Sequence, residues 1–134
     1  MKIHASAENY LETILVLQKR NGHVRSIDIV NELDFTKPSV SVAMKNLRQN
    51  GMIDVDAGGY ITLLDEGRAI AEKIFERHTL LTQWLIRLGV SPEVADEDAC
   101  RLEHVLSTES FEAIKRSYQS GGSKGSSELP SHLL

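Results

Sequence analysis

Cysteine is almost absent from this 134-residue chain, which contains only Cys100. One thiol cannot build an internal disulfide framework, and it suits a reducing compartment, where it stays available as a ligand. Long apolar runs are missing as well: no stretch approaches the ~20 residues that span a bilayer, and the N-terminal residues lack the apolar core of a signal peptide. The sequence therefore favours a cytoplasmic protein over a membrane or secreted one.

A basic excess is also lacking, because the formal net charge is −4 at pH 7. The charges are uneven, however: residues 1–60 are neutral in sum, and the acidic excess falls in the remainder. Within the neutral half, residues 36–50 carry Lys37, Lys45 and Arg48 and no acid. Phosphate groups respond to such local patches and not to the overall charge, so the composition is compatible with DNA binding.

Residues 1–63 have the pattern of a winged helix-turn-helix. Ser26 and Thr36 are expected to cap two of the helices, and Pro38 would lie in the first turn of the third. Alternating apolar residues on either side of the tripeptide 57–59 predict a β-hairpin, which would be the wing. A chance succession of such elements in a small α+β domain is the alternative. Apolar residues at helical spacing predict helices over residues 6–19, 26–33 and 36–50.

The third of these helices is the expected recognition helix and supplies the candidate DNA-binding residues. Its first turn would meet base edges and flanking phosphates in the major groove, and its later residues would contact phosphates. For its serines, helix capping and simple exposure fit the pattern equally well. The candidates are Thr36, Lys37, Ser39, Ser41, Lys45 and Arg48.

Residues 64–119 are expected to form a helical second unit, so the fold class is mainly α with a small β-hairpin. A long helix from residue 65 to about 88 has more apolar surface than one small core needs, which predicts a homodimer. A last helix would be capped by Thr108, and the Gly- and Ser-rich segment 120–134 is expected to be a disordered tail. The predicted dimer interface comprises Leu80, Leu81, Trp84 and Leu85, although Trp84 would serve equally well in the core.

Cys100, Glu103 and His104 have the spacing i, i+3 and i+4, which places them on one face of a helix. Their sulfur, oxygen and nitrogen donors suit a divalent transition metal better than Mg²⁺ or Ca²⁺. Two further donors, His78 and Glu12, lie on other predicted helices. Taken alone, His78 is more often a core histidine and Glu12 a solvated surface residue.

The strings ENYLETI, KPSVSVAMKNLRQNGMI, LLDEGRAIA, RHTLL and DEDACRLEHVLS resemble the diphtheria toxin repressor family of iron- and manganese-dependent regulators. The resemblance runs from about residue 7 to 115. It implies an N-terminal winged helix-turn-helix followed by a helical metal-binding and dimerisation domain, without the SH3-like domain of longer members. It also implies homodimers that bind a palindromic double-stranded operator. The ligands implied for Fe(II) or Mn(II) are Asn9, Glu12, His78, Cys100, Glu103 and His104.

The implied ligand set is a hybrid of the two branches of the family. Asn9 stands where iron-type members have Met and manganese-type members Asp, whereas Glu12 resembles the manganese type and Cys100 the iron type. Thr82 and Asp96 replace the Glu and His of the ancillary site of iron-type members. Zn(II) and Co(II) should also bind such donors in vitro.

The sequence therefore predicts a metal-activated repressor that controls metal-uptake genes. One alternative is a metal-independent winged-helix regulator that senses a small molecule, in which the Cys, Glu and His face is structural. The other is an enzyme with Cys100 as nucleophile and His104 as base. We expect no enzyme, because this pair comes with no third orienting group and no oxyanion-hole motif.

Overall fold

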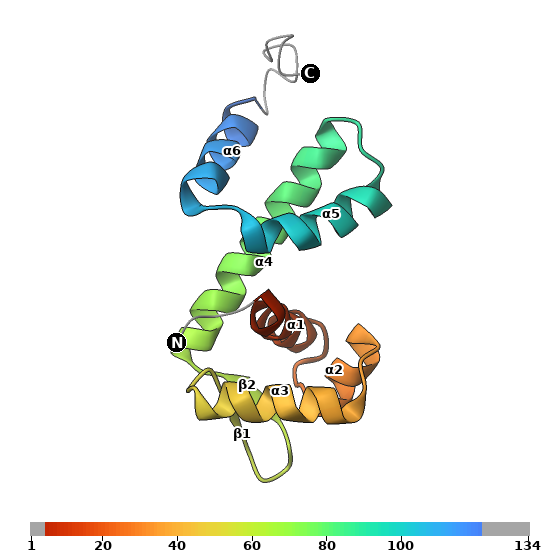
Figure 1. Cartoon of the computed structure of the whole chain (residues 1–134), viewed down its shortest axis with the longest axis vertical. Helices are drawn as coiled ribbons and strands as arrows, with labels where there is room; N and C mark the ends of the chain where they lie inside the picture. Colours follow the sequence, from red (N-terminus) through yellow and green to blue (C-terminus); the bar gives the residue numbers. More distant parts are fainter. Residues whose placement is uncertain (1–4, 122–134) are drawn as a thin grey trace. The chain divides into compact units, whose positions relative to one another are not determined.

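The computed structural model describes residues 5–121, in which six helices and one β-hairpin occur (Figure 1). The prediction of a mainly α fold with a small hairpin is confirmed. The predicted tail, residues 120–134, lies outside the described residues except for Ser120 and Gly121, which end the last helix. The elements are α1 (Ala5–Asn21), α2 (Ser26–Leu33), α3 (Lys37–Gln49), β1 (Ile53–Val55), β2 (Ile61–Leu63), α4 (Asp65–Arg87), α5 (Pro92–Val105) and α6 (Thr108–Gly121).

Contacts divide the chain into two compact units after Phe75, within α4. The predicted boundary after residue 63 stays a prediction. No helix among residues 5–121 is both long and apolar enough to cross a membrane.

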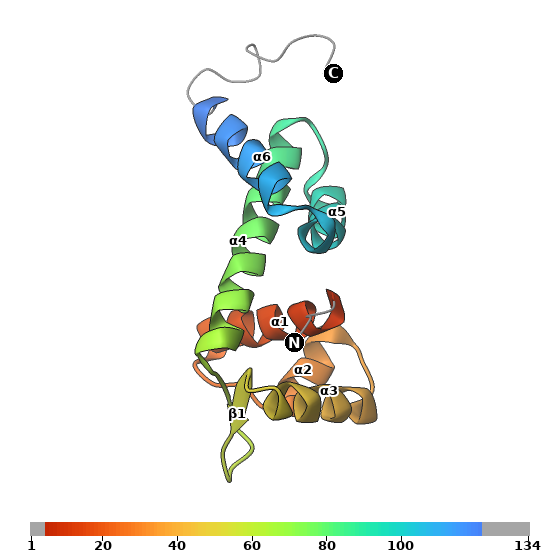
Figure 2. The same ribbon diagram turned by 60° about the vertical axis from the view of Figure 1, so that its left-hand side comes forward.

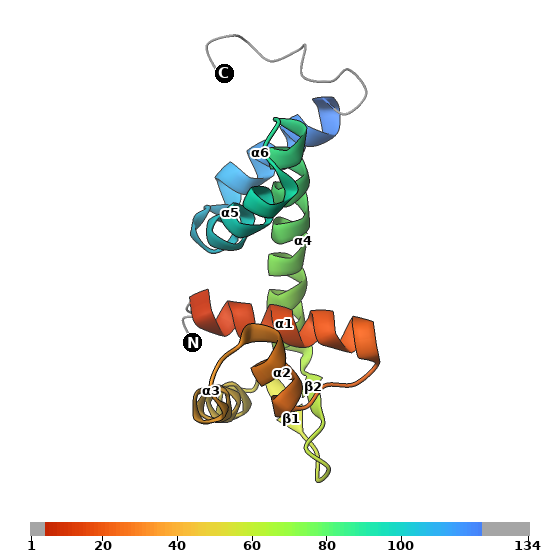
Figure 3. The ribbon, with the colours of Figure 1, turned by 90° about the vertical axis from the view of Figure 1, so that its right-hand side faces the viewer.

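The N-terminal unit is built around α1, which packs against α2, α3 and β2. Figures 2 and 3 show α3 and the hairpin on the same side of α1. The core of this unit follows the predicted helical and alternating periodicities. Its fully or almost fully buried side chains include Leu11, Ile14 and Leu15 of α1, Val40, Met44 and Leu47 of α3, and Ile53, Ile61 and Leu63 of the hairpin.

The hairpin is antiparallel, with Asp54 opposite Thr62 in its register. Its turn is held by the Asp56 carboxylate, whose Oδ1 accepts the backbone N–H groups of Gly58 and Tyr60 at 2.9 Å each. Gly59 has a φ of 84°, which favours glycine at this position. The predicted wing is therefore a short β-hairpin whose turn is stabilised by its own hydrogen bonds.

The helix caps agree with the sequence analysis at α3 and differ at α2. The Thr36 hydroxyl accepts the N–H of Ser39 at 3.2 Å, as predicted for an N-cap. Ser26 was expected to cap α2, but it is the first helical residue and Arg25 occupies the N-cap. The reason is the Asp28 carboxylate, which accepts the backbone N–H of Arg25 at 2.9 Å and starts the helix there.

The C-terminal unit comprises the second half of α4 together with α5 and α6. Its core contains Leu80, Leu81, Ala99 and Phe111, with Trp84 packed against it. Ser91 caps α5 by accepting the N–H of Val94 at 3.4 Å, ahead of Pro92 in the first turn. At α6 the expected cap Thr108 is wrong: the hydroxyl of Ser107 accepts the N–H of Ser110 at 3.1 Å instead. The two positions are adjacent in the sequence, and both side chains are of the capping type.

The predicted dimer residues are partly used inside their own unit. Leu80 is 9% exposed and Leu81 0%, so these two side chains offer little surface to a second copy. Trp84 and Leu85 are half-buried. Their place in a dimer interface stays a prediction. The larger exposed apolar side chains of this unit are Ile86, Leu88, Val94 and Val105.

Gly67 gives a test of the packing in the N-terminal unit. A Cβ atom on this residue of α4 would lie 2.1 Å from the backbone oxygen of Met52, which cannot move like a side-chain end. We expect Gly67→Ala to lower the free energy of unfolding by about 1–3 kcal/mol, although the same change in an open helix stabilises. Denaturant titration followed by circular dichroism measures the shift. Gly121→Ala is the control, because its Cβ would meet only Arg87 Nη1, at 3.9 Å; equal effects would contradict the packing.

Candidate metal centre

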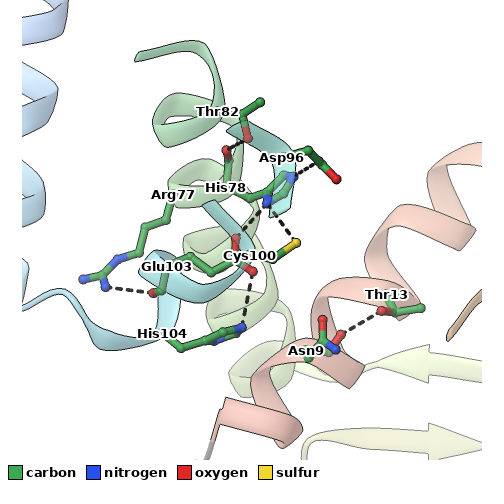
Figure 4. A network of polar contacts seen from close by, with 9 residues as sticks. All are labelled: Asn9, Thr13, Arg77, His78, Thr82, Asp96, Cys100, Glu103 and His104. Carbon is green, nitrogen blue, oxygen red and sulfur yellow. Dashed lines mark hydrogen bonds and ion pairs between the residues drawn. The ribbon is translucent and has the colours of Figure 1, made fainter. Parts of the chain in front are cut away.

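A cluster of donor side chains lies between α4 and α5 (Figure 4). His78 comes from α4, while Asp96, Cys100 and Glu103 lie at i, i+4 and i+7 of α5. This spacing keeps the three acidic groups on one face of the helix. The face meets the His78 ring, so the cluster is held by two packed helices and not by a loop.

The imidazole ring of His78 is the centre of the cluster. Its Nδ1 lies 2.9 Å from Glu103 Oε2 and 3.7 Å from Cys100 Sγ, and its Nε2 lies 2.9 Å from Asp96 Oδ1. Both ring nitrogens therefore face acidic groups. Cys100 and Glu103 raise the pKa of His78 to about 11, against the partial burial of the ring. At neutral pH the ring is protonated, and its two N–H groups donate to the carboxylates.

Glu103 is the most deeply buried member of the cluster, with 1% of its surface exposed. Its Oε1 atom accepts no hydrogen bond, although His104 Nε2 lies 3.3 Å away. A buried carboxylate oxygen without a donor is unfavourable unless a positive charge comes near it. A cation bound in the cluster would supply that charge.

The donor atoms are close enough together to hold one ion. One atom each from His78, Asp96 and Cys100 all lie within 4.8 Å of one another. Ligands of a transition metal at ~2.0–2.3 Å are themselves separated by a few ångströms, so small side-chain shifts would suffice. Imidazole, thiolate and carboxylate together suit a first-row transition metal and not Ca²⁺ or Mg²⁺. These residues therefore fit a divalent metal such as Fe(II) or Mn(II).

Hydrogen bonds from side chains to backbone oxygens stabilise the helices that carry the donors. Arg77 is buried, and its Nη1 donates to the backbone oxygens of Glu103 at 3.1 Å and Leu106 at 2.7 Å. Its guanidinium also lies 5.1 Å from the Phe111 ring centre. The side chain therefore fastens the C-terminal end of α5 to α4, next to the carboxylate that faces His78. On α4 itself, the Thr82 hydroxyl donates to the backbone oxygen of His78 at 2.7 Å.

Four of the predicted ligands, His78, Cys100, Glu103 and His104, come together in the C-terminal unit. Asp96 joins them, although the sequence analysis placed it only at an ancillary position. The sequence could have indicated this position, because Asp96 and Cys100 are four residues apart and therefore share a face of the helix.

The other two predicted ligands, Asn9 and Glu12, lie on α1 in the N-terminal unit. The backbone oxygen of Asn9 accepts the Thr13 hydroxyl at 2.8 Å. Their role as ligands stays a prediction.

The predicted DNA-binding residues all lie at or along α3 and all are exposed. Two of them are occupied in the helix cap: the Thr36 hydroxyl donates to Ser39 Oγ at 2.8 Å and accepts the N–H of Ser39. Lys37, Ser41, Lys45 and Arg48 extend from the helix into solvent.

Each half of the chain matches the model of a known protein family. Residues 2–58 match the family model described as iron dependent repressor, N-terminal DNA binding domain. Residues 64–120 match the model described as iron dependent repressor, metal binding and dimerisation domain.

Solved structures share this fold. The structure of the manganese regulator SloR has a TM-score of 0.76 at 23% identity, over 89% of this chain and 55% of that one. A manganese-dependent transcriptional repressor in complex with manganese also has a TM-score of 0.76, at 26% identity, over 84% of this chain and 52% of that one. The chain thus spans about half the length of these solved proteins.

Curated relatives extend the similarity to sequence. The transcriptional regulator MntR of Escherichia coli O6:H1 is 33% identical over 117 residues, which cover 87% of this chain and 76% of the relative. The iron-dependent repressor IdeR of Mycobacterium bovis is 30% identical over 103 residues, which cover 76% of this chain and 45% of the relative. With both family models matched in order, the chain belongs to the diphtheria toxin repressor family of iron- and manganese-dependent transcriptional regulators.

Proposed function

We propose that this chain is a cytoplasmic, homodimeric repressor that binds a DNA operator when Fe(II) or Mn(II) occupies the cluster around His78. The observation that carries the proposal is the group of acidic donors around one half-buried imidazole, in a chain that also contains a winged helix-turn-helix. Metal-uptake genes are the targets that suit such a sensor, because repression when metal is abundant limits further uptake.

The proposed ligands within the C-terminal unit are His78, Asp96, Cys100, Glu103 and His104. When bound, a divalent cation would supply the positive charge that the three acidic groups now draw from one protonated ring. His78 would give up a proton in exchange, and Glu103 would gain a partner for the oxygen that accepts no hydrogen bond. Asn9 and Glu12 remain candidate ligands on the basis of the family resemblance.

Repression requires that the metal-bound protein prefer the DNA-binding arrangement, and the energy needed is small. A tenfold gain in DNA affinity corresponds to about 1.4 kcal/mol of coupling between the two sites. Compensating the charge of one buried carboxylate, Glu103, is of that size or larger.

A catalytic role has one observation in its favour. Cys100, His78 and Asp96 follow one another in the order of a Cys–His–Asp triad. However, Glu103 Oε2 lies 2.9 Å from the same Nδ1 that would have to accept the thiol proton, so the ring is protonated and cannot act as a base. We therefore propose no enzymatic activity.

Metal titration of chelator-stripped protein tests the proposal directly. We expect saturable, anaerobic binding of Fe²⁺ and Mn²⁺ by calorimetry, together with a gain of about tenfold or more in affinity for a duplex selected from a random pool. Fluorescence anisotropy in the same buffer measures the DNA binding. Full DNA binding in excess chelator would instead identify a metal-independent regulator with a structural Cys, Glu and His face.

Cys100 should set part of the metal preference. Replacing the thiolate by a carboxylate, Cys100→Asp, should shift the ratio of Co²⁺ to Mn²⁺ affinity towards Mn²⁺ by about tenfold, because the softer sulfur donor favours the later metal. Competition with a fluorescent chelator measures the ratio, and loss of the sulfur-to-cobalt absorption band reports the missing ligand. Val105→Asp adds the same charge to α5 about 140° around the helix from residue 100 and should leave the ratio unchanged. An unaltered ratio in Cys100→Asp would exclude sulfur ligation.

Metal affinity should fall as the pH falls. The raised pKa of His78 keeps a proton on the ring at neutral pH, and a metal that binds a ring nitrogen must displace it. Each displaced proton makes the apparent affinity about tenfold weaker per pH unit as the solution is acidified. Calorimetry in two buffers of different ionisation enthalpy counts the protons released. His23→Gln, at an exposed histidine of the other unit, should keep the same slope; a flat profile for the unaltered protein would contradict ligation by His78.

A further inference from the structure

The outward face of α3 has an apolar residue at its centre. Val42 is 60% exposed, whereas Val40, Met44 and Leu47 of the same helix are buried. At about 100° per residue, position 42 lies almost opposite the line formed by the three buried side chains. Val42 is therefore not an edge residue of the core, and no packing among the described residues of its unit explains a β-branched apolar side chain there.

The surroundings of Val42 are polar and basic. Its neighbours on the outward face are Lys45, Asn46 and Gln49, all exposed. Residues 36–50 contain three basic side chains and no acid. A protein partner with an apolar surface would have to cover these charges, whereas a nucleic acid would place phosphates beside them. Charge complementarity thus selects DNA as the occupant of this face.

The chemistry of the base edges narrows what an exposed valine can recognise. In the major groove the C5 methyl of thymine is the apolar group, and the other bases present hydrogen-bond donors and acceptors. Valine has no polar atom, and its χ1 angle is restricted, so its two methyl groups form a stiff apolar contact. It would contact a thymine methyl favourably and would leave the amino group of cytosine or adenine without a partner.

The polar residues first expected to read bases are less free to do so. The hydroxyls of Thr36 and Ser39 bond to each other in the helix cap, and Ser41 lies about 100° around the helix from Val42. We infer that Val42 is a specificity-determining residue, which reads the methyl group of one thymine in each half-site of the operator. This inference rests on the proposed function, since it needs α3 to enter the major groove.

Uracil substitution tests the inference, because it removes the thymine methyl and leaves the hydrogen-bonding groups of the base unchanged. A duplex is first selected from a random pool with metal-loaded wild-type protein, and each thymine of a half-site is then replaced singly by uracil. We expect one position at which the replacement weakens binding by about fourfold, the value for one lost methyl contact. Fluorescence anisotropy with metal-loaded protein gives the thymine-to-uracil affinity ratio at every position.

Variants of the valine identify the residue that makes the contact. In Val42→Ala the ratio at the sensitive position should fall to about one, as a double-mutant cycle requires, and Val42→Thr, which keeps one methyl, should retain part of it. Ile27→Ala is the matched control, because Ile27 is an exposed apolar residue of the same unit on α2. Its ratio should equal that of the wild type. Circular dichroism verifies that each variant is folded.

The outcomes separate this inference from the proposed function. Metal-dependent selection of a duplex with no uracil-sensitive thymine, or a sensitivity that persists in Val42→Ala, would overturn the role of Val42 alone. Failure of metal-loaded protein to enrich any duplex would overturn the proposed function and, with it, this inference. A uracil effect of equal size at every thymine would indicate a change in DNA shape and would also count against Val42.

Discussion

The C-terminal unit depends on the contacts of one imidazole ring with three acidic side chains. His78 faces Glu103 and Cys100 through one nitrogen and Asp96 through the other. All three acidic groups come from α5 and the ring from α4, so the pairing sets the register of the two helices. The remaining contacts support it: Arg77 fixes the end of α5 behind Glu103, and Leu81 with Ala99 fills the space beside it.

The balance of charge explains why a divalent cation suits this arrangement. A protonated ring brings one positive charge to a thiol and two carboxylates, one of them buried and incompletely hydrogen-bonded. Burial makes each uncompensated charge more costly than it would be in water. A divalent ion brings one more charge than the proton it displaces. Under the proposed function, a bound ion would therefore compensate the negative charge of the cluster more fully than the protonated ring does.

Most of the fold could be predicted because its signals are local or periodic. The helical spacing of Val40, Met44 and Leu47 marked the buried side of α3, and alternation marked the hairpin. The cap of α2 was misplaced by one residue, since Asp28 reaches back to Arg25, a contact that spacing alone does not reveal. The cover of Leu80 and Leu81 within their own unit could not be predicted, because periodicity shows that a face is apolar and not which element covers it. The structure shows that α5 and α6 supply that cover.

At the candidate site, too, the residues close in sequence could be predicted, whereas the contacts between different helices could not. The face formed by Cys100, Glu103 and His104 followed from sequence spacing, whereas the part played by Asp96 needed the position of the His78 ring. Choice of metal is a harder problem than detection of the site, because Zn(II) and Co(II) bind nitrogen and sulfur donors more tightly than Fe(II) or Mn(II). Affinity alone cannot make this chain an iron or manganese sensor. Selectivity would have to come from the mixture of one cysteine sulfur with two carboxylates, from the coordination that two packed helices permit, and from the ions available in the cell.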